Sequence, residues 1–395
     1  MAQIRRGGQV QSKLAFLIYG DKGTWKSSLA LEFAKMNNEK SEPMKVLYID
    51  TEEGSIDDYL NGLAADGVDI NNIYVLKTKT FNETLDLVKQ ARNVSVKKAI
   101  RAISEDENGK EEVELLNEDG SVFIPDAIVI DSTTVLYNQL VQAILEMSQK
   151  RAAQRANKAG VMGAEKTLAI EMAGLEVKDY QTINHRGQEL ILDLMASGKH
   201  FAVIARETEI KTQKPDSNNQ FQTVGTGKMK PEGFKEVEYN VKTVLHTFNK
   251  DGKTYAVVED KDRTGVKKQN EQIENPTLLD WSVVIKNNVG KKEVKVKNTV
   301  EESIKADVAA LQKKIIEQTG ENLVDESDFN ENLDSLKTEI TKMISEIKDG
   351  EKRAELKKLC DTHNIPLKFT EIKEEETLTR MRDLIKDFLT KNNIH

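Results

Sequence analysis

The sequence predicts an α/β fold built on a mainly parallel central sheet, followed by a small α-helical domain. Three observations predict it. Short β-rich runs alternate with helical stretches in the first half of the chain, as they do in parallel α/β sheets. A glycine-containing turn with the spacing of a phosphate-binding loop follows the first β-rich run. Beyond about residue 298, apolar residues recur three and four positions apart, as in amphipathic helices.

The elements follow from these patterns. The expected strands are residues 14–19, 46–50, 73–76, 127–131, 201–205, 241–248 and 254–259. The expected helices are residues 26–36, 82–92, 137–156 and 177–197. Two turn signals in residues 99–123 predict an inserted surface hairpin. Residues 281–297 are expected to form a strand and a linker, so the core domain spans 1–297 and the helical domain 298–395.

Composition limits the class of protein. With 395 residues and 31% charged residues, the chain is expected to form more than one soluble domain. No apolar run approaches the roughly 20 residues that cross a bilayer, and the N-terminal segment lacks the apolar core of a cleavable signal. The single cysteine, Cys360, excludes an internal disulfide and a cysteine-rich zinc site. We therefore expect no membrane partner and an intracellular location. The net charge of −8 leaves nucleic-acid binding open, because that depends on local basic surfaces.

Residues 17–30, LIYGDKGTWKSSLA, carry the phosphate-loop spacing. Backbone amides of residues 22–28 are expected to face a β-phosphate. Lys26 would neutralise the β- and γ-phosphates, and the Ser27 hydroxyl would bind Mg²⁺. The expected nucleotide-binding residues are Gly20, Asp21, Lys22, Gly23, Thr24, Trp25, Lys26, Ser27 and Ser28.

Trp25 stands at the position before the lysine, where glycine is usual. Glycine is favoured there because the backbone approaches the phosphate closely at little steric cost. Trp25 still supplies its backbone N–H, so the loop can function if the indole points away. The indole then either packs on the protein or lies near the nucleotide.

Carboxylates end two of the expected strands. Residues 46–53, VLYIDTEE, end in Asp50, Glu52 and Glu53, and residues 125–132, PDAIVIDS, end in Asp131-Ser132. The carboxyl ends of parallel strands lie where a phosphate loop opens. We expect Asp131 to hold Mg²⁺ directly or through water, and Glu52 or Glu53 to polarise the attacking water. Acids that merely end one strand in solvent are common, but two such strands after a phosphate loop favour a nucleotide site.

In this order, the motifs resemble those of RecA-type ATPases, and residues 48–88 carry most of the similarity through their Asp-x-Glu strand end and GVDINN turn. The resemblance covers residues 13–266 and implies a RecA-like P-loop NTPase core. It makes Glu52 the catalytic glutamate, Lys26 and Ser27 the phosphate and Mg²⁺ residues, and Asp131 the second Mg²⁺ residue. In size and motif style the chain is similar to compact phage RecA-like ATPases of the AAA family, associated with single-strand annealing and recombination.

That resemblance carries further expectations. It implies ATP and Mg²⁺ as cofactors, single-stranded DNA as a partner, and a homo-oligomer (ring or filament) with nucleotide between subunits. It also implies a phage-encoded protein in the cytoplasm of a bacterial host. Residues 259–265, EDKDRTG, resemble a basic motif of RadA-type proteins, so Lys261 and Arg263 are candidate fingers that reach a neighbouring subunit's nucleotide. The alternative for this motif is an ordinary basic β-turn.

Residues 208–232 are polar and rich in Lys, Gln, Asn and Gly, and they predict a mobile loop where RecA-like proteins contact DNA. Stacking on a base is expected of Phe221. Phosphate contacts are expected of Lys211, Lys214, Lys228 and Lys230. A solvated loop or β-hairpin is the alternative. Residues 149–160 could form a second nucleic-acid loop or the exposed side of a helix.

The leading hypothesis is a DNA-stimulated ATPase acting on single-stranded DNA in recombination, annealing or repair. The alternative is a nucleotide-controlled assembly or loading factor that recruits a replication or other protein through its C-terminal helices. A nucleotide-bound oligomer without turnover is a third hypothesis. Residues 353–367 have the rhythm of a small helix–turn–helix unit, but their acidic residues favour a protein partner at least as much as DNA.

Overall fold

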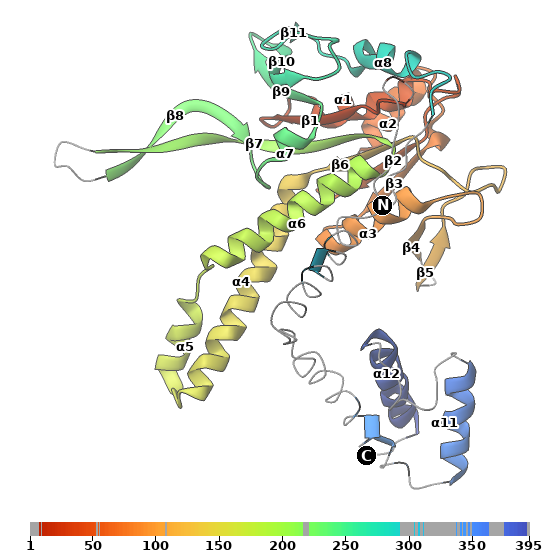
Figure 1. The fold of residues 1–395 in the computed structure, drawn as a ribbon, viewed down its shortest axis with the longest axis vertical. Helices are drawn as coiled ribbons and strands as arrows, with labels where there is room; N and C mark the ends of the chain where they lie inside the picture. Colours follow the sequence, from red (N-terminus) through yellow and green to blue (C-terminus); the bar gives the residue numbers. More distant parts are fainter. Residues whose placement is uncertain are drawn as a thin grey trace. The chain divides into compact units, whose positions relative to one another are not determined.

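The protein was analysed as a computed structural model (Figure 1). The structure describes residues 8, 10–52, 54, 56–106, 109–215 and 221–292, and towards the C-terminus residues 304, 307–308, 311, 337, 340–341, 343–344, 347, 350–362 and 375–392. The chain divides into two compact units, Met1–Ser303 and Ile304–His395.

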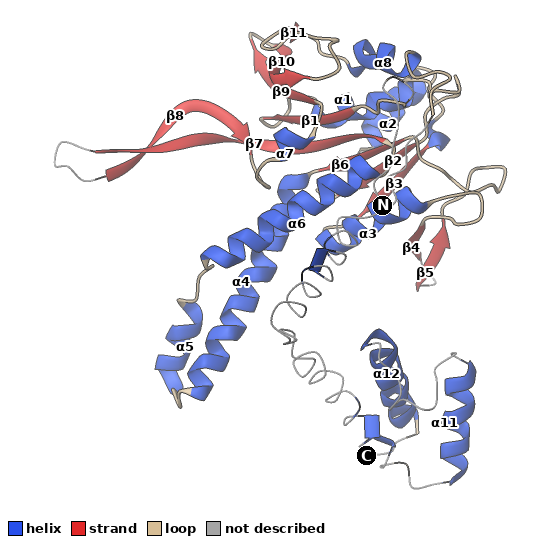
Figure 2. Cartoon of the chain, in the orientation of Figure 1, coloured by secondary structure: helices blue, strands red, loops and turns tan. Residues whose placement is uncertain are grey.

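The secondary structure is mixed (Figure 2). The described strands are β1 (Ala15–Gly20), β2 (Val46–Asp50), β3 (Ile73–Lys77), β4 (Arg101–Asp106), β5 (Gly109–Glu114), β6 (Ala127–Asp131), β7 (His200–Pro215), β8 (Phe221–Pro231), β9 (Thr243–Lys250), β10 (Lys253–Asp262) and β11 (Gln272–Glu274). The described α-helices are α1 (Lys26–Leu31), α2 (Asp57–Ala65), α3 (Phe81–Asn93), α4 (Thr133–Lys158), α5 (Gly163–Glu171), α6 (Val177–Ala196), α7 (Val237–Asn240), α8 (Ser282–Lys286), α11 (Gly350–Thr362) and α12 (Glu375–Lys391). Short 3₁₀ helices occupy Glu32–Lys35, Ile70–Asn72 and Leu278–Trp281.

The first unit is organised around one large sheet with the strand order β11-β10-β9-β1-β7-β6-β2-β3. The six strands from β9 to β3 in this order run parallel, whereas β10 and β11 pair antiparallel at one edge. Every residue of β1, β2 and β6 is buried, as expected for central parallel strands covered on both faces. The predicted α/β fold with a mainly parallel sheet is confirmed.

Helices cover both faces of this sheet. Alternate strand residues such as Leu47 and Ile130 pack against the apolar sides of α3, α4 and α6. The intervening residues, among them Phe16 and Tyr48, pack against α1, α2, α8 and the two 3₁₀ helices that adjoin α1 and α8. This alternation follows from the period of two in a strand and makes a three-layer core.

Two polar segments, residues 208–232 and 99–123, can be compared with what the sequence predicted for them. Of residues 208–232, predicted as a mobile loop, residues 208–215 and 221–231 pair antiparallel as parts of β7 and β8 and project from the sheet (Figure 1). The structure thus has the β-hairpin that was the alternative to a loop: this segment is polar on both faces, and a projecting two-stranded arm needs no apolar face. Where residues 99–123 were expected to insert a hairpin, β4 and β5 pair antiparallel.

The segment expected as a strand and linker from residue 281 is also different. A 3₁₀ helix, Leu278–Trp281, leads directly into α8, and Trp281 is almost fully buried against Phe16 at a ring-centroid distance of 5.3 Å. Apolar spacing in this short segment does not distinguish a strand from one helical turn, and packing of the indole into the core decides for the helix. Residues 293–297 lie outside the described residues.

The second unit has its own small core. Apolar residues of α11 and α12, including Leu356, Cys360 and Phe388, are buried together with Ile340 and Ile347. Cys360 is a buried free thiol. Of the remaining expected C-terminal helical residues, only those noted above are described. Among the described helices of the whole chain, none combines the length and apolar character needed to traverse a bilayer.

Candidate nucleotide site

The phosphate loop lies between β1 and α1 and is held by β9. Gly20 pairs with Thr247, and a Cβ at position 20 would lie only 2.0 Å from the Thr247 carbonyl oxygen. The hydroxyls of Thr24 and Thr247 are 2.8 Å apart. Asn249 donates a hydrogen bond from Nδ2 to the Gly23 carbonyl at 3.1 Å. Glycine is therefore required at position 20 by a close approach of two strands.

Trp25 has a backbone conformation that explains why glycine is usual at its position. Its φ of 63° and ψ of 23° lie in the left-handed region, which costs a side chain about 1–2 kcal/mol. The indole is 59% exposed and contacts the Tyr59 ring edge-on, with the centroids 6.4 Å apart. The Trp25 carbonyl accepts hydrogen bonds from the Leu29 amide and the Ser28 hydroxyl, both at 2.9 Å. The loop thus accommodates the tryptophan with its side chain directed towards α2.

Lys26 follows as the first residue of α1. Its ammonium group donates a hydrogen bond to the Asp21 carbonyl at 2.6 Å, which folds the side chain over the loop. Burial lowers the pKa of Lys26, and the nearby carboxylates of Asp131 and Glu52 oppose that shift. The cation therefore lies over the loop that is expected to bind phosphate.

Ser27 and Asp131 come together as expected for a magnesium site. The Ser27 hydroxyl donates a hydrogen bond to Asp131 Oδ2 at 2.5 Å. Tyr48 donates a second one to the same oxygen, also at 2.5 Å. Burial raises the pKa of Asp131, and these two hydrogen bonds act in the opposite direction.

The residues present fit Mg²⁺ bound with a nucleotide. Among the described residues, no group of three or more His, Cys, Asp or Glu side chains could hold a metal ion by themselves. Mg²⁺ characteristically takes one or two protein oxygens and completes its shell with water and substrate phosphates. Ser27 Oγ and Asp131 are such a pair of hard oxygen donors, next to the loop expected to bind phosphate.

Glu52 lies at the same end of the sheet. Its Oε1 accepts hydrogen bonds from the Ser132 hydroxyl at 2.6 Å and from Arg206 Nε at 3.2 Å. Both donors bind Oε1, so in the described part of the chain Oε2 is the oxygen left to polarise a water. Glu53, the other sequence candidate, lies outside the described residues.

These groups line one cleft with a volume of about 550 Å³. Its walls come from the ends of β1, β2, β6 and β7. The lining includes Gly20 to Ser27, Glu52, Asp131, Ser132, Arg206 and Glu207. Eight of the nine expected loop residues, together with Glu52 and Asp131, therefore share one cleft. The ninth, Ser28, lines a neighbouring pocket instead.

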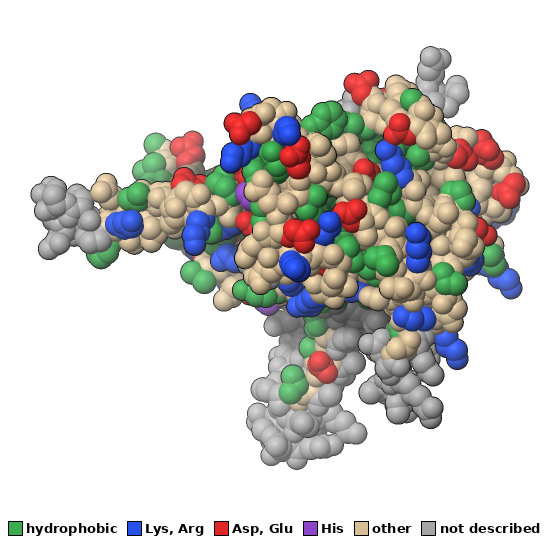
Figure 3. All heavy atoms as spheres, turned by 90° about the horizontal axis from the view of Figure 1, so that it is seen from above, with side chains coloured by type: hydrophobic (Ala, Val, Ile, Leu, Met, Phe, Trp, Pro, Cys, Tyr) green, Lys and Arg blue, Asp and Glu red, His purple; other side chains and the backbone are tan. Residues whose placement is uncertain are grey.

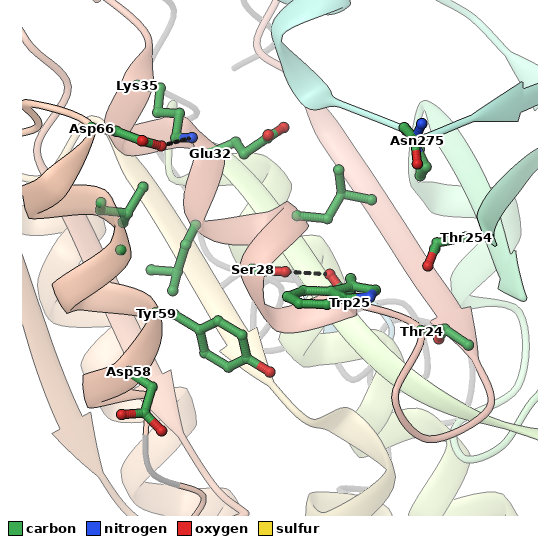
Figure 4. Close-up of a pocket in the computed structure, with 15 residues that line it drawn as sticks. Thr24, Trp25, Ser28, Glu32, Lys35, Asp58, Tyr59, Asp66, Thr254 and Asn275 are labelled. Atoms are coloured by element: carbon green, nitrogen blue, oxygen red, sulfur yellow. Dashed lines mark hydrogen bonds and ion pairs between the residues drawn. The ribbon is translucent and has the colours of Figure 1, made fainter. Parts of the chain in front are cut away.

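That neighbouring pocket has a volume of about 500 Å³ and lies between α1, α2 and the turn before the 3₁₀ helix at Leu278–Trp281. In Figure 4, Trp25 lies between Tyr59 on one side and Thr254 and Asn275 on the other. Thr24, Trp25 and Tyr59 line both this pocket and the cleft. The two spaces therefore meet at the phosphate loop.

Comparison with known proteins identifies the family. A family model described as an AAA domain matches residues 12–273, about two thirds of the chain. The chain belongs to this AAA domain family. Its core has the nucleotide-binding fold of AAA-type ATPases, and the matched residues include the whole cleft. No curated protein sequence matches the chain.

Solved structures also resemble this chain. One is a KaiC-like protein from the hyperthermophilic archaeon Pyrococcus horikoshii OT3, at 13% sequence identity and a TM-score of 0.35. That similarity covers 67% of this chain and 91% of the archaeal chain.

Lys261 and Arg263 lie away from the cleft of their own AAA domain. Lys261 Nζ and Arg263 Nη2 both donate to the Tyr239 carbonyl, at 2.9 and 3.2 Å. Asp262, between them, pairs with Thr243, which lies level with Phe16 near the start of β1. The phosphate loop follows the C-terminal end of β1. At the rise per residue of a β-strand, that end lies about 13 Å from Phe16. The two cations are thus not brought to the cleft within one chain.

The expected DNA-contacting residues lie on the β7–β8 arm but not on one surface. Strand register places Lys211 opposite Gly225, on the same face as Phe221. Lys214, opposite Gln222, and Lys230, opposite Thr208, lie on the other face, and Lys228 lies within the irregular part of β8. All four lysines are exposed. Acidic as well as basic side chains are visible around this projection in Figure 3.

Several residues of the site were not predicted from the sequence. Tyr48, Tyr59 and Thr247 contact or line it, and so do Ser132, Arg206 and Glu207, whose positions the sequence marked without a role for them. A signal existed for Tyr48, because alternate residues of a strand share a face and Tyr48 precedes Asp50 by two. Residues 149–160, weighed as a second nucleic-acid loop, belong mainly to the end of α4.

Proposed function

We propose that this AAA domain protein is a Mg²⁺-dependent ATPase that acts on single-stranded DNA in phage-type recombination, annealing or repair. The observation that carries the proposal is the path of β7. The strand runs beside β1 and β6 in the sheet, passes the cleft at Arg206 and Glu207, and continues into the projecting arm. A ligand on the arm would therefore act on the same strand that borders the phosphate cleft.

The cleft and the neighbouring pocket would bind different parts of ATP. The phosphate groups would lie in the cleft against the loop amides and Lys26, and the base in the pocket, where Trp25 and Tyr59 offer aromatic surfaces. Ser27 and Asp131 would hold the metal ion, which supplies charge neutralisation for the transferring phosphoryl group. Glu52 would orient and deprotonate the attacking water.

The arm would contact single-stranded DNA. Its lysines offer charge to phosphates on both faces, and Phe221, 73% exposed at the start of β8, offers a ring for a base. Because the lysines are divided between two faces, we expect a strand that wraps around the arm or two contacts with separate strands.

Under this proposal, Lys261 and Arg263 would act on the nucleotide of a second subunit and not on that of their own chain. Their place at the opposite end of β1 from the phosphate loop suits a homo-oligomer, ring or filament, in which they approach a neighbour's nucleotide. A cation added beside a transferring phosphoryl group stabilises its developing charge.

The test is ATP hydrolysis with and without single-stranded DNA at low salt. We expect DNA to stimulate hydrolysis, and a variant with Lys211, Lys214, Lys228 and Lys230 all changed to Ala to lose the stimulation and keep basal hydrolysis. Hydrolysis that DNA does not change, together with no DNA binding, contradicts the DNA part of the proposal. The absence of ATP binding to folded protein contradicts all of it.

A second function, a nucleotide-controlled assembly factor for a protein partner, is favoured by a different observation. No residue of α5 is buried, and the apolar side chains of Met162, Met172 and Val177 are each more than 75% exposed. Exposed methionines are frequent on surfaces that bind proteins. Under this function, Met162→Lys with Met172→Lys abolishes partner-dependent activity and leaves DNA stimulation as in the unaltered protein.

A further inference from the structure

The Tyr48 hydroxyl has a partner that core packing does not require. Tyr48 is fully buried in the middle of β2, among residues that pack under α1. Phenylalanine would fill almost the same volume. The hydroxyl instead reaches Asp131 Oδ2 at 2.5 Å. In this contact the phenol O–H donates and the carboxylate oxygen accepts.

The strand register makes this contact a fixed feature of the sheet. Tyr48 lies opposite Val129, and Asp131 is two residues further along β6. Residues two apart in a strand share a face, so the two side chains are diagonal neighbours under α1. Ser27, in the first turn of α1, approaches the same carboxylate from the helix.

Two hydroxyls therefore hold a single carboxylate oxygen. Ser27 is itself the expected metal ligand, so its orientation depends on the bound ion. Tyr48 is anchored by the core and offers a contact that the ion does not displace. A carboxylate that is already held by one permanent donor loses less rotational freedom when it binds a cation. Groups that hydrogen-bond to a metal ligand in this way commonly contribute ten- to a hundredfold to metal affinity.

We propose that Tyr48 is a positioning residue that fixes the Asp131 carboxylate for Mg²⁺ in this nucleotide site. The inference rests on the proposed function and adds to it a residue outside the phosphate loop. It concerns metal affinity, not binding of the nucleotide itself.

The test is a titration of the ADP-bound protein with MgCl₂, measured by calorimetry. We expect Tyr48→Phe to raise the Mg²⁺ dissociation constant about tenfold or more. The affinity for ADP in the presence of EDTA should stay unchanged. The matched control is Tyr74→Phe, which removes a hydroxyl that donates to the Leu116 carbonyl, away from the site, and should not change Mg²⁺ affinity.

Two outcomes separate the inference from the proposed function. If the unaltered protein binds ADP and Mg²⁺, and folded Tyr48→Phe binds Mg²⁺ with the same affinity, the role of Tyr48 is overturned and the ATPase proposal stands. If folded unaltered protein binds neither, the proposed function itself fails. Tyr48→Met also lacks the hydroxyl, so it must show the same loss if Tyr48→Phe does not fold.

Discussion

Arg206 forms an ion pair with Glu52, with Nη2 and Oε1 separated by 3.2 Å. Arg206 is where β7 leaves the sheet, so the pair joins the root of the arm to the residue expected to activate water. The guanidinium neutralises the carboxylate while the pair persists. Glu207, the next residue, contacts His246 on β9 instead, so the root is held to the sheet on both sides.

We expect Arg206→Gln to raise basal ATP hydrolysis about two- to fivefold, the effect of losing an exposed ion pair worth up to about 1 kcal/mol. The physical reason is that the Glu52 carboxylate, no longer held and neutralised at Oε1 by the guanidinium, can turn towards the attacking water. Steady-state hydrolysis without DNA measures it. Arg101→Gln, which removes an exposed ion pair with Glu114 in the β4–β5 hairpin, is the control and should have no effect. A loss of hydrolysis in Arg206→Gln would show that Arg206 assists catalysis instead of restraining Glu52.

Lys26 and Glu52 should separate binding from turnover. We expect Lys26→Ala to weaken ATP binding about a hundredfold, because it removes the cation that faces the phosphates. Glu52→Gln should bind ATP normally and lose about a hundredfold or more in turnover, since the amide cannot take a proton. Calorimetry and single-turnover hydrolysis measure the two quantities. Equal loss of binding in both variants would contradict the roles assigned.

Trp25 should report nucleotide binding by fluorescence. Its indole lines both the cleft and the neighbouring pocket and is 59% exposed, whereas Trp281, the other tryptophan, is buried in the core. We expect ATP or ADP to change the emission intensity by shielding Trp25 from water, and Trp25→Phe to lose that change while it still binds nucleotide. A signal that persists in Trp25→Phe would place the change at Trp281 and contradict the pocket assignment.

His246 should make stability depend on pH. Burial alone would lower its pKa, but hydrogen bonds with Glu259 and Glu207 outweigh burial and raise it. The folded protein therefore favours protonated His246 more than the unfolded chain does. Its contribution, about 1 kcal/mol, is complete below the unfolded pKa of about 6.5 and is lost as pH rises through the higher folded pKa.

Urea denaturation at several pH values measures this contribution. His246→Gln should be less stable than the unaltered protein at acidic pH, and the difference should shrink as the pH increases. A difference that stays constant with pH would exclude protonation of His246 as its cause.

Gly20 should not tolerate alanine. The added Cβ would lie 2.0 Å from the Thr247 carbonyl oxygen and 2.5 Å from its hydroxyl, so β1 and β9 would have to separate. We expect Gly20→Ala to lower the free energy of unfolding by about 1–3 kcal/mol. Gly62→Ala in α2, where nothing lies within 4 Å of the added Cβ, is the matched control and should be neutral or stabilising. Thermal melting distinguishes them.

The sequence allowed the sheet and the cleft to be predicted because both depend on local patterns. Apolar runs mark the buried strands, and Lys26, Ser27 and Asp131 stand at fixed places relative to strand ends. The Arg206–Glu52 pair and the Tyr48–Asp131 hydrogen bond depend on which strands become neighbours, and one sequence does not specify that order. The arm was weighed only as an alternative to a mobile loop for another reason: β7 continues from a buried stretch into a polar one, and composition alone does not show that both belong to one strand.

The register of the arm has a practical consequence. Glu207 pairs with Pro231 at its base, so the strands are already side by side where they leave the body of the protein. A tight turn grafted across this base would excise the projection without cutting any ladder of the large sheet. The arm can thus be removed as a unit, and a variant without it would show whether ligand binding depends on the arm while the parallel strands and the nucleotide cleft stay in place.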